Sequence, residues 1–343
     1  MITIHTEKHR LRASKTELFG GELVPPFECP ERVDYILGRV REVGLGAVRE
    51  PDEHGTEPLG RIHDADYLAF LETAWAEWQA AGMKGEAIPT VWPSRRMPRM
   101  VVPNYIDGKL GYYCLAGETS ISGGTWEAAR ASADVALTAA ALVAGGERAA
   151  FALCRPPGHH AAQDMYGGYC FLNNAALAAQ ALRDAGSARV AILDVDFHHG
   201  NGTQAIFYDR ADVLFLSLHG DPMEAFPHYL GGADETGEGP GAGFNVNYPL
   251  PRNTEWHAWS AALDNAIARL KAFGADAIVV SLGVDTFKED PISFFRLESD
   301  HFTEMGARIA AVGLPTLFVM EGGYAVAEVG INTVNVLTGF EGA

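Results

Sequence analysis

Short apolar segments rich in β-branched residues recur along the chain, separated by longer segments in which apolar residues repeat every three to four positions. The short segments predict strands at residues 2–4, 150–153, 190–195, 213–218, 277–282 and 316–320. The longer segments predict helices at residues 125–143, 174–184, 255–273, 299–311 and 325–337. Because strands and helices alternate, we predict an α/β fold with an open, mostly parallel sheet that carries helices on both faces.

Residues 72–125 interrupt this alternation and are rich in Trp, Tyr and Pro. A connection of this length is usually functional or disordered, and its aromatic content argues against disorder. We predict a single domain over residues 1–343, in which 72–125 is an ordered insertion that packs on the functional site or on a second subunit. The alternative is a surface excursion that packs only on itself.

Composition narrows the classes of partner. The 343 residues include 26 Lys plus Arg and 44 Asp plus Glu, a net charge of −18, which argues against nucleic acid or an anionic membrane as a partner. Hydrophobic residues make up 48% and charged residues 20%, as in a protein with a large core.

The four cysteines form no CxxC pair and follow no secretory signal pattern, so we expect a cytoplasmic protein with reduced thiols. We find no apolar run near the ~20 residues that span a membrane.

Residues capable of catalysis or metal binding follow directly after several predicted strands. In an open parallel sheet the ligand site lies beyond the carboxyl ends of the strands, because the loops that follow them converge there. The segments are Arg155-Pro-Pro-Gly-His159-His160, Asp194-Val-Asp196-Phe-His198-His199-Gly200-Asn201-Gly202, Gly283-Val-Asp285 and Glu321-Gly-Gly-Tyr324. We therefore predict one active site at this edge of the sheet.

Asp196 and His198 are predicted to bind one metal ion together with Asp285. Asp196 and His198 are two positions apart at a strand end, so their side chains point to the same side. Three Asp/His ligands leave a position for water, which is typical of a catalytic zinc site, and oxygen and nitrogen donors also suit Fe2+, Mn2+ or Co2+. Taken singly, Asp196 could instead cap a helix and His198 could be an ordinary buried histidine.

Two further groups are candidates for the chemistry itself. His159 and His160 can present both rings to one small volume, one as general base and the other as its electrostatic partner. Asp194 and Asn201 could each accept an N–H from one of these rings and so fix its tautomer. Tyr324 follows two glycines and could donate its hydroxyl to a developing oxyanion. A structural role for the histidines, or a packed turn at the tyrosine, is the alternative.

These four segments together resemble the zinc-dependent deacetylase family of histone deacetylases and acetylpolyamine amidohydrolases. The resemblance runs from about residue 10 to the end of the chain, and residues 15–27 and the insertion look closest to the bacterial acetylpolyamine amidohydrolases. It implies an arginase/deacetylase-type α/β fold. It also implies a homodimer in which the 72–125 insertion caps the active site and contributes to the interface.

The resemblance also implies roles for individual residues. Zn2+ would bind Asp196, His198 and Asp285, while His160 would act as general base and acid beside His159, and Tyr324 would donate to the amide carbonyl. Residues implied to contact substrate are Gly168, with Tyr169 and Phe226 as the aromatic walls of a tunnel, and the acids Glu17, Asp107 and Glu118, which would hold an ammonium group.

Structural K+ is implied as well. One site would use the side chains of Asp194, Asp196 and Ser217 and backbone carbonyls near His198 and Leu218, and a second would lie around Phe207 and Val213.

We therefore predict removal of acetyl groups from small, cationic acetylated polyamines or diamines. A protein-lysine deacetylase is the main alternative. A ureohydrolase with two manganese ions is suggested by Ser281–Asp285 and Asp290-Pro291, but Gly283 stands where a second bridging carboxylate would be needed. A non-catalytic protein that binds acylated amines is the remaining alternative.

Overall fold

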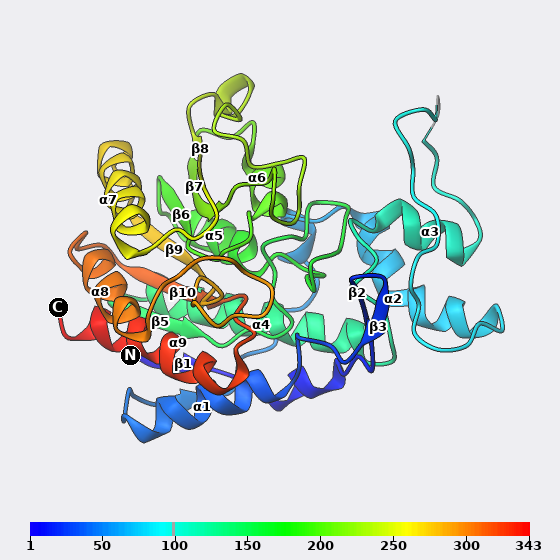
Figure 1. Ribbon diagram of the computed structural model, residues 1–343, viewed down its shortest axis with the longest axis horizontal. Coiled ribbons are helices and arrows are strands. Elements are labelled where there is room, and N and C mark those ends of the chain that lie inside the picture. The colour runs from blue at the N-terminus through cyan, green and yellow to red at the C-terminus, as the bar shows by residue number, and fades with distance from the viewer. Residues whose placement is uncertain (98–99) are drawn as a thin grey trace.

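Eight parallel strands form the central sheet (Figure 1). The computed structural model describes residues 1–97 and 100–343, and the order of strands in this part of the chain is β4-β1-β5-β10-β9-β6-β7-β8. Each strand predicted from the sequence is present, with small differences at its ends. The strands are β1 (Ile2–Ile4), β4 (Val48–Arg49), β5 (Ala149–Ala152), β6 (Val190–Asp194), β7 (Val213–Gly220), β8 (Asn245–Leu250), β9 (Ala277–Leu282) and β10 (Thr316–Met320). A separate hairpin consists of β2 (Glu17–Phe19) and β3 (Glu22–Val24).

Two hydrophobic cores lie on the two faces of the sheet. Along β6, Val190 and Ile192 belong to one core, while Ala191 and Leu193 belong to the other. Successive side chains of a strand point to opposite faces, so a strand covered on both sides must be apolar at every position. This explains the continuous apolar runs in the sequence.

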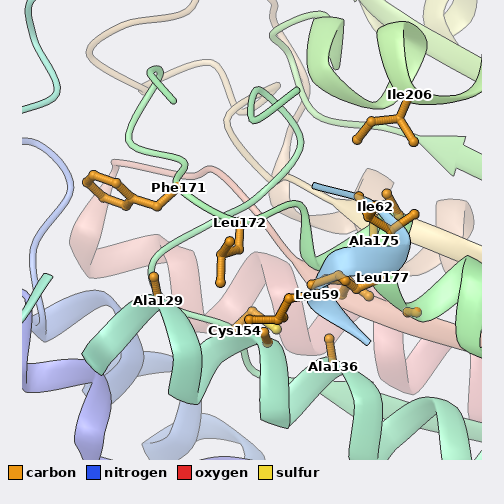
Figure 2. Packing of buried hydrophobic residues seen from close by; sticks show 14 of the residues in the cluster. Leu59, Ile62, Ala129, Ala136, Cys154, Phe171, Leu172, Ala175, Leu177 and Ile206 are labelled. Atoms are coloured by element: carbon orange, nitrogen blue, oxygen red, sulfur yellow. The ribbon is translucent and has the colours of Figure 1, made fainter. Parts of the chain in front are cut away.

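Helices cover both faces, as predicted. Those that contribute to the first core are α2 (Ala65–Ala80), α3 (Ile106–Tyr113), α4 (Thr125–Ala144), α5 (Asn174–Asp184) and α6 (Asn201–Phe207). Those of the second are α1 (Glu31–Glu42), α7 (Trp256–Phe273), α8 (Ser299–Ala310) and α9 (Val326–Glu341). Figure 2 shows Ala129 and Ala136 of α4 turned toward Leu172 and Cys154, where small side chains let the helix pack closely. Helices α1, α2, α3 and α6 were not predicted from the sequence.

The 72–125 insertion is only partly irregular. It begins inside α2 and contains α3, and Trp78 and Tyr113 are buried against the first core. The connection between these helices projects away from the sheet (Figure 1). Its exposed apolar side chains are Val91, Met97, Met100, Val101, Val102 and Tyr105.

The ends of the chain meet beside the sheet. The amino group of Met1 lies 3.4 Å from the carboxylate of Glu341 at the end of α9. Among the described residues, no helix combines the length and the apolar character needed to cross a membrane. All four cysteines are free thiols.

Candidate active site

Four neighbouring strands carry the predicted catalytic residues. β5, β10, β9 and β6 lie side by side in the sheet, so the loops at their carboxyl ends share one space. These loops hold His159 and His160 after β5, Tyr324 after β10, Asp285 after β9, and Asp196 and His198 after β6.

Asp196, His198 and Asp285 converge as the sequence predicted. The three residues are buried, and their potential ligand atoms all lie within 4.8 Å of one another. Nδ1 of His198 is 2.9 Å from Oδ2 of Asp285 and 3.2 Å from Oδ1 of Asp196. Burial and the neighbouring Asp196 carboxylate both disfavour the ionised form of Asp285 and raise its pKa.

The surrounding backbone orients these carboxylates. The backbone N–H of Gly322 donates to Asp196 Oδ2 (2.8 Å) and that of Phe197 donates to Asp285 Oδ1 (2.7 Å). A Cβ at residue 322 would lie 2.5 Å from Asp285 Oδ2, so only glycine leaves this space open. The donor set and its orienting hydrogen bonds fit a divalent metal such as zinc.

His160 points into the adjoining cavity. Its Nδ1 lies 2.7 Å from Oδ1 of Asn201, whose amide nitrogen donates to the His160 carbonyl, so Nδ1–H is the donor. Nε2 is therefore the nitrogen that can accept a proton. Burial lowers the pKa of His160 well below its ordinary value, and the positive charge of His159 lowers it further. A neutral ring with a free Nε2 is the state that a general base requires.

His159 has a different environment. Its Nδ1 donates to Asp194 Oδ2 at 3.0 Å, and its Nε2 lies 3.8 Å from Asp196 Oδ1. Burial alone would lower the pKa of His159, but the carboxylates of Asp196 and Asp194 outweigh it and raise the pKa to about 10. The two adjacent rings, 4.1 Å apart, therefore favour opposite protonation states.

Tyr324 also lines the cavity, and its ring lies 5.5 Å from that of Tyr169. Burial raises the pKa of Tyr324 well above its ordinary value, so its hydroxyl stays protonated and can donate a hydrogen bond. Asp290 Oδ2 accepts the backbone N–H of Tyr324 at 2.7 Å. Arg32 donates from Nε to the Gly323 carbonyl at 2.7 Å.

The cavity next to these groups has a volume of about 310 Å³ and largely aromatic walls. The ring of Phe226 stands 5.1 Å from that of His160. The backbone of Gly168 (φ +55°) passes so close that a Cβ there would collide with the His160 ring. The aromatic residues that line the cavity are Phe19, Tyr169, Phe197, Phe226, Phe294 and Tyr324.

Glu17 and Glu118 also line this cavity. Glu17 accepts from the Tyr169 hydroxyl at 3.0 Å and from the Phe27 backbone at 3.1 Å. Burial raises the pKa of Glu17 to about 7, and these hydrogen bonds limit the rise. Glu118 accepts the backbone N–H of Gly168 at 2.8 Å. Asp107 lies in α3, accepts from Thr90, and is not among the described residues that line the cavity of this chain.

The family model of the histone deacetylase domain, which describes its sequences, matches residues 26–340 of this chain. The chain belongs to the histone deacetylase family. It is 60% identical to the acetylpolyamine amidohydrolase of Mycoplana ramosa over the full length of both chains. It is 57% identical to acetylpolyamine amidohydrolase 2 of Pseudomonas aeruginosa, covering 100% of this chain and 99% of that protein.

Solved structures agree with this assignment. The crystal structure of acetylpolyamine aminohydrolase from Burkholderia pseudomallei is similar with a TM-score of 0.94 and 41% identity, covering 99% of this chain and 98% of that one. The HDA15 HD domain is similar with a TM-score of 0.81 and 25% identity, covering 99% of this chain and 88% of that one. These comparisons confirm the predicted family, the arginase/deacetylase-type α/β fold and the prediction of an amide-hydrolysing deacetylase.

Position 283 has no room for the second bridging carboxylate that a two-metal, ureohydrolase-like site would need. A Cβ on Gly283 would collide with the Asp196 carboxylate. Gly283 therefore favours a site with a single metal ion.

Of the residues predicted for K+, Asp194 and Ser217 lie toward the carboxyl ends of the strands, on the side of the metal cluster, whereas Val213 lies at the amino end of β7. Asp194 of β6 pairs with Ser217 of β7, and Leu218 is the next residue of β7. Asp194 Oδ1 accepts the backbone N–H of Asp196, and Ser217 Oγ lies 2.8 Å from Nδ1 of His219. Phe207 ends α6, and Val213 begins β7.

Several residues that support the site were missed by the sequence analysis. Glu321 accepts the backbone N–H groups of Gly158 and His159 at 2.7 and 3.1 Å, which fixes the loop that carries both histidines. Arg155 forms a buried ion pair with Glu28 at 2.7 Å. Glu321 and Arg155 stand inside the quoted motifs, and a charged residue directly after an apolar strand segment was the sequence signal that could have indicated a supporting role.

Proposed function

We propose that this protein hydrolyses the acetyl amide of small acetylated diamines or polyamines with the help of a bound zinc ion. The observation that carries the proposal is the cavity itself, which His160, Tyr324, Glu17, Glu118 and several aromatic side chains line together. The names of the relatives, acetylpolyamine amidohydrolases, support the same substrate class.

Each catalytic group has a task that follows from its contacts. Asp196, His198 and Asp285 would hold zinc, which supplies a Lewis acid that polarises a carbonyl and acidifies water. His160 accepts a proton from the attacking water at Nε2 and then returns it to the departing amine. Tyr324 donates its hydroxyl to the acetyl oxygen as negative charge develops there. His159, held by Asp194, supplies positive charge beside His160.

The acidic wall suits a cationic substrate. The partners of Glu17 and Glu118 are hydroxyl and backbone N–H groups, which leave the negative charge available to a ligand. Glu224 also lines the cavity, but Arg252 pairs with it at 2.8 Å. An alkyl chain between the aromatic rings would place a terminal ammonium near the first two acids.

A homodimer is part of the proposal. The described residues of the projecting connection between α2 and α3 expose six large apolar side chains, and such clusters mark interaction surfaces. In a dimer this segment, with Asp107 beside it, would narrow the cavity mouth of the partner subunit. We also propose K+ at the Asp194/Ser217 and Phe207/Val213 positions and a reducing, cytoplasmic setting, which the free thiols support.

The test is a comparison of kcat/KM for acetylputrescine, acetylcadaverine, acetylspermidine and an acetyl-lysine peptide. We expect the small amines to exceed the peptide by at least about 100-fold, a difference of ~2.7 kcal/mol in transition-state binding. A peptide turned over as efficiently as acetylcadaverine would establish the protein-lysine deacetylase instead. No turnover of any acetylated amine by the zinc-loaded protein would favour the binding protein.

The matched control separates local charge from net charge. Glu118→Gln should reduce kcat/KM for acetylcadaverine more than for an uncharged acetamide of similar length. Glu147→Gln removes the same charge just before β5, at the opposite edge of the sheet, and should affect both substrates alike. Equal effects of the two variants would contradict a specific role for Glu118.

A further inference from the structure

A second cluster of metal-ligand side chains lies outside the cavity. His5 follows β1, and Glu7 and His9 belong to the short 3-10 helix η1 (Glu7–Leu11) that comes next. Potential ligand atoms of these three residues all lie within 4.8 Å of one another. Among the described residues, this is the only such group besides Asp196, His198 and Asp285.

The histidine rings of this cluster are buried without adequate partners. His9 is 2% exposed, and neither of its ring nitrogens has a hydrogen-bond partner among the described residues. His5 is 5% exposed, and within the described chain its Nε2 has only the exposed carboxylate of Glu7 as a partner. A buried polar nitrogen without a partner typically costs about 1–3 kcal/mol, so the environment of these rings favours a ligand that accepts their lone pairs.

The third residue connects the cluster to solvent. Glu7 is 65% exposed in its side chain, and Oε1 lies 3.3 Å from Nε2 of His5. This separation matches the edge of a tetrahedron around zinc, which is about 3.3 Å for bonds of 2.0–2.1 Å. Oε2 of Glu7 is held by Nε of Arg10 at 2.8 Å, which leaves Oε1 to face the histidines.

We propose that His5, Glu7 and His9 bind one divalent metal ion of the zinc class, at a site separate from the catalytic cluster. Two imidazoles and one carboxylate suit Zn2+, Co2+ or Ni2+ rather than Mg2+ or Ca2+, which prefer oxygen ligands. His9 would supply the third donor, since its ligand atom lies within 4.8 Å of the other two, and water from the Glu7 side would complete the coordination.

The site has a structural role. The metal would join the end of β1 to η1. The backbone of η1 is also bound by Arg155, whose Nη1 donates to the carbonyl of His9 at 2.7 Å. Because ligands that bind only the folded state stabilise it, the ion would raise the melting temperature of the protein. This site does not depend on the substrate proposed above.

The experiment uses the untagged full chain, stripped by chelator and titrated with Zn2+ and, in parallel, Co2+. We expect two equivalents of metal per chain by elemental analysis after desalting. Glu7→Gln, an exposed change that should not disturb folding, and His5→Gln should each retain one. Asp285→Ala should also retain one, and Asp285→Ala with Glu7→Gln none.

A surface histidine elsewhere provides the control. His257→Gln removes an exposed imidazole in α7 and should keep both equivalents. One equivalent in the wild type, or a second equivalent that survives both Glu7→Gln and His5→Gln, would overturn the proposal. Calorimetric melting with and without Zn2+ gives an independent readout, since the Zn2+-dependent rise should be smaller for Glu7→Gln than for His257→Gln.

Discussion

The guanidinium of Arg32 lies 4.9 Å from the centroid of the Tyr324 ring. The same group donates to the carbonyls of Gly323 and Glu321, the residues that lead into the tyrosine. Arg32 is 2% exposed, and its charge is balanced by Glu28 at 3.2 Å. One planar side chain thus holds both the ring and the backbone of the proposed oxyanion donor, which makes Arg32 a positioning residue.

Arg32→Lys should reduce kcat while leaving KM for acetylcadaverine nearly unchanged. Lysine keeps the charge but loses the planar fork that grips two carbonyls and the ring face. We expect a loss of about 10- to 100-fold, the size of effect that a small misplacement of a catalytic group produces. In a Tyr324→Phe background the same change should cost little more, because it acts through the hydroxyl. Arg39→Lys, in the same helix, is the control, and additive losses would contradict this role.

Tyr324→Phe should keep the fold and the bound zinc but lose most turnover. Removing one oxyanion donor typically lowers kcat by about 10²- to 10³-fold. Steady-state kinetics, metal analysis and a melting curve on the same sample test this together. If kcat is unchanged, the tyrosine is only a packed turn residue.

His160→Ala should be at least as damaging to kcat as His159→Ala. Only His160 presents a free Nε2 to the cavity, whereas Nδ1 of His159 is bound to Asp194. Loss of a general base and acid costs about 10²- to 10⁴-fold. Zinc content should be measured in both variants, so that loss of metal is not mistaken for loss of proton transfer. The reverse order of damage would exchange the two assignments.

The central sheet and its site were predictable for the same physical reason. Strands buried on both faces are apolar at every position, and polar residues directly after them, such as Asp196 after β6, must lie at one edge. A residue that reaches the site from a helix elsewhere in the chain, and not from a strand end, carries no such signal. Arg32 and Gly323 are separated by 291 positions, and only the fold brings them into contact.

Helix α1 was not predicted for a different reason. Val33, Ile36, Leu37 and Val40 are buried at helical spacing, so the pattern was present in the sequence but was not recognised between two segments rich in proline. The prolines of the insertion favour a long connection, but the segment also contains the end of α2 and all of α3. Tertiary packing of Trp78 and Tyr113 stabilises these helices.

Because the proposed substrate is a cation and Glu17 is an ionisable group of the cavity, KM should depend on pH. The pKa of Glu17 is raised to about 7 by burial, so this side chain is mostly neutral below pH 6 and mostly ionised above pH 8. A primary ammonium, with an ordinary pKa near 10, stays charged over this range. KM for acetylcadaverine should therefore fall as pH rises from 6 to 8, by about 3- to 10-fold, which corresponds to a charge interaction of ~1 kcal/mol.

KM for an uncharged acetamide of similar length should not follow the same curve, and the ratio of the two KM values removes effects on the shared catalytic groups. Glu17→Gln should make this ratio independent of pH, whereas Glu147→Gln should leave its pH dependence intact. A ratio that stays constant from pH 6 to 8 in the wild type would mean that Glu17 does not contact the ammonium.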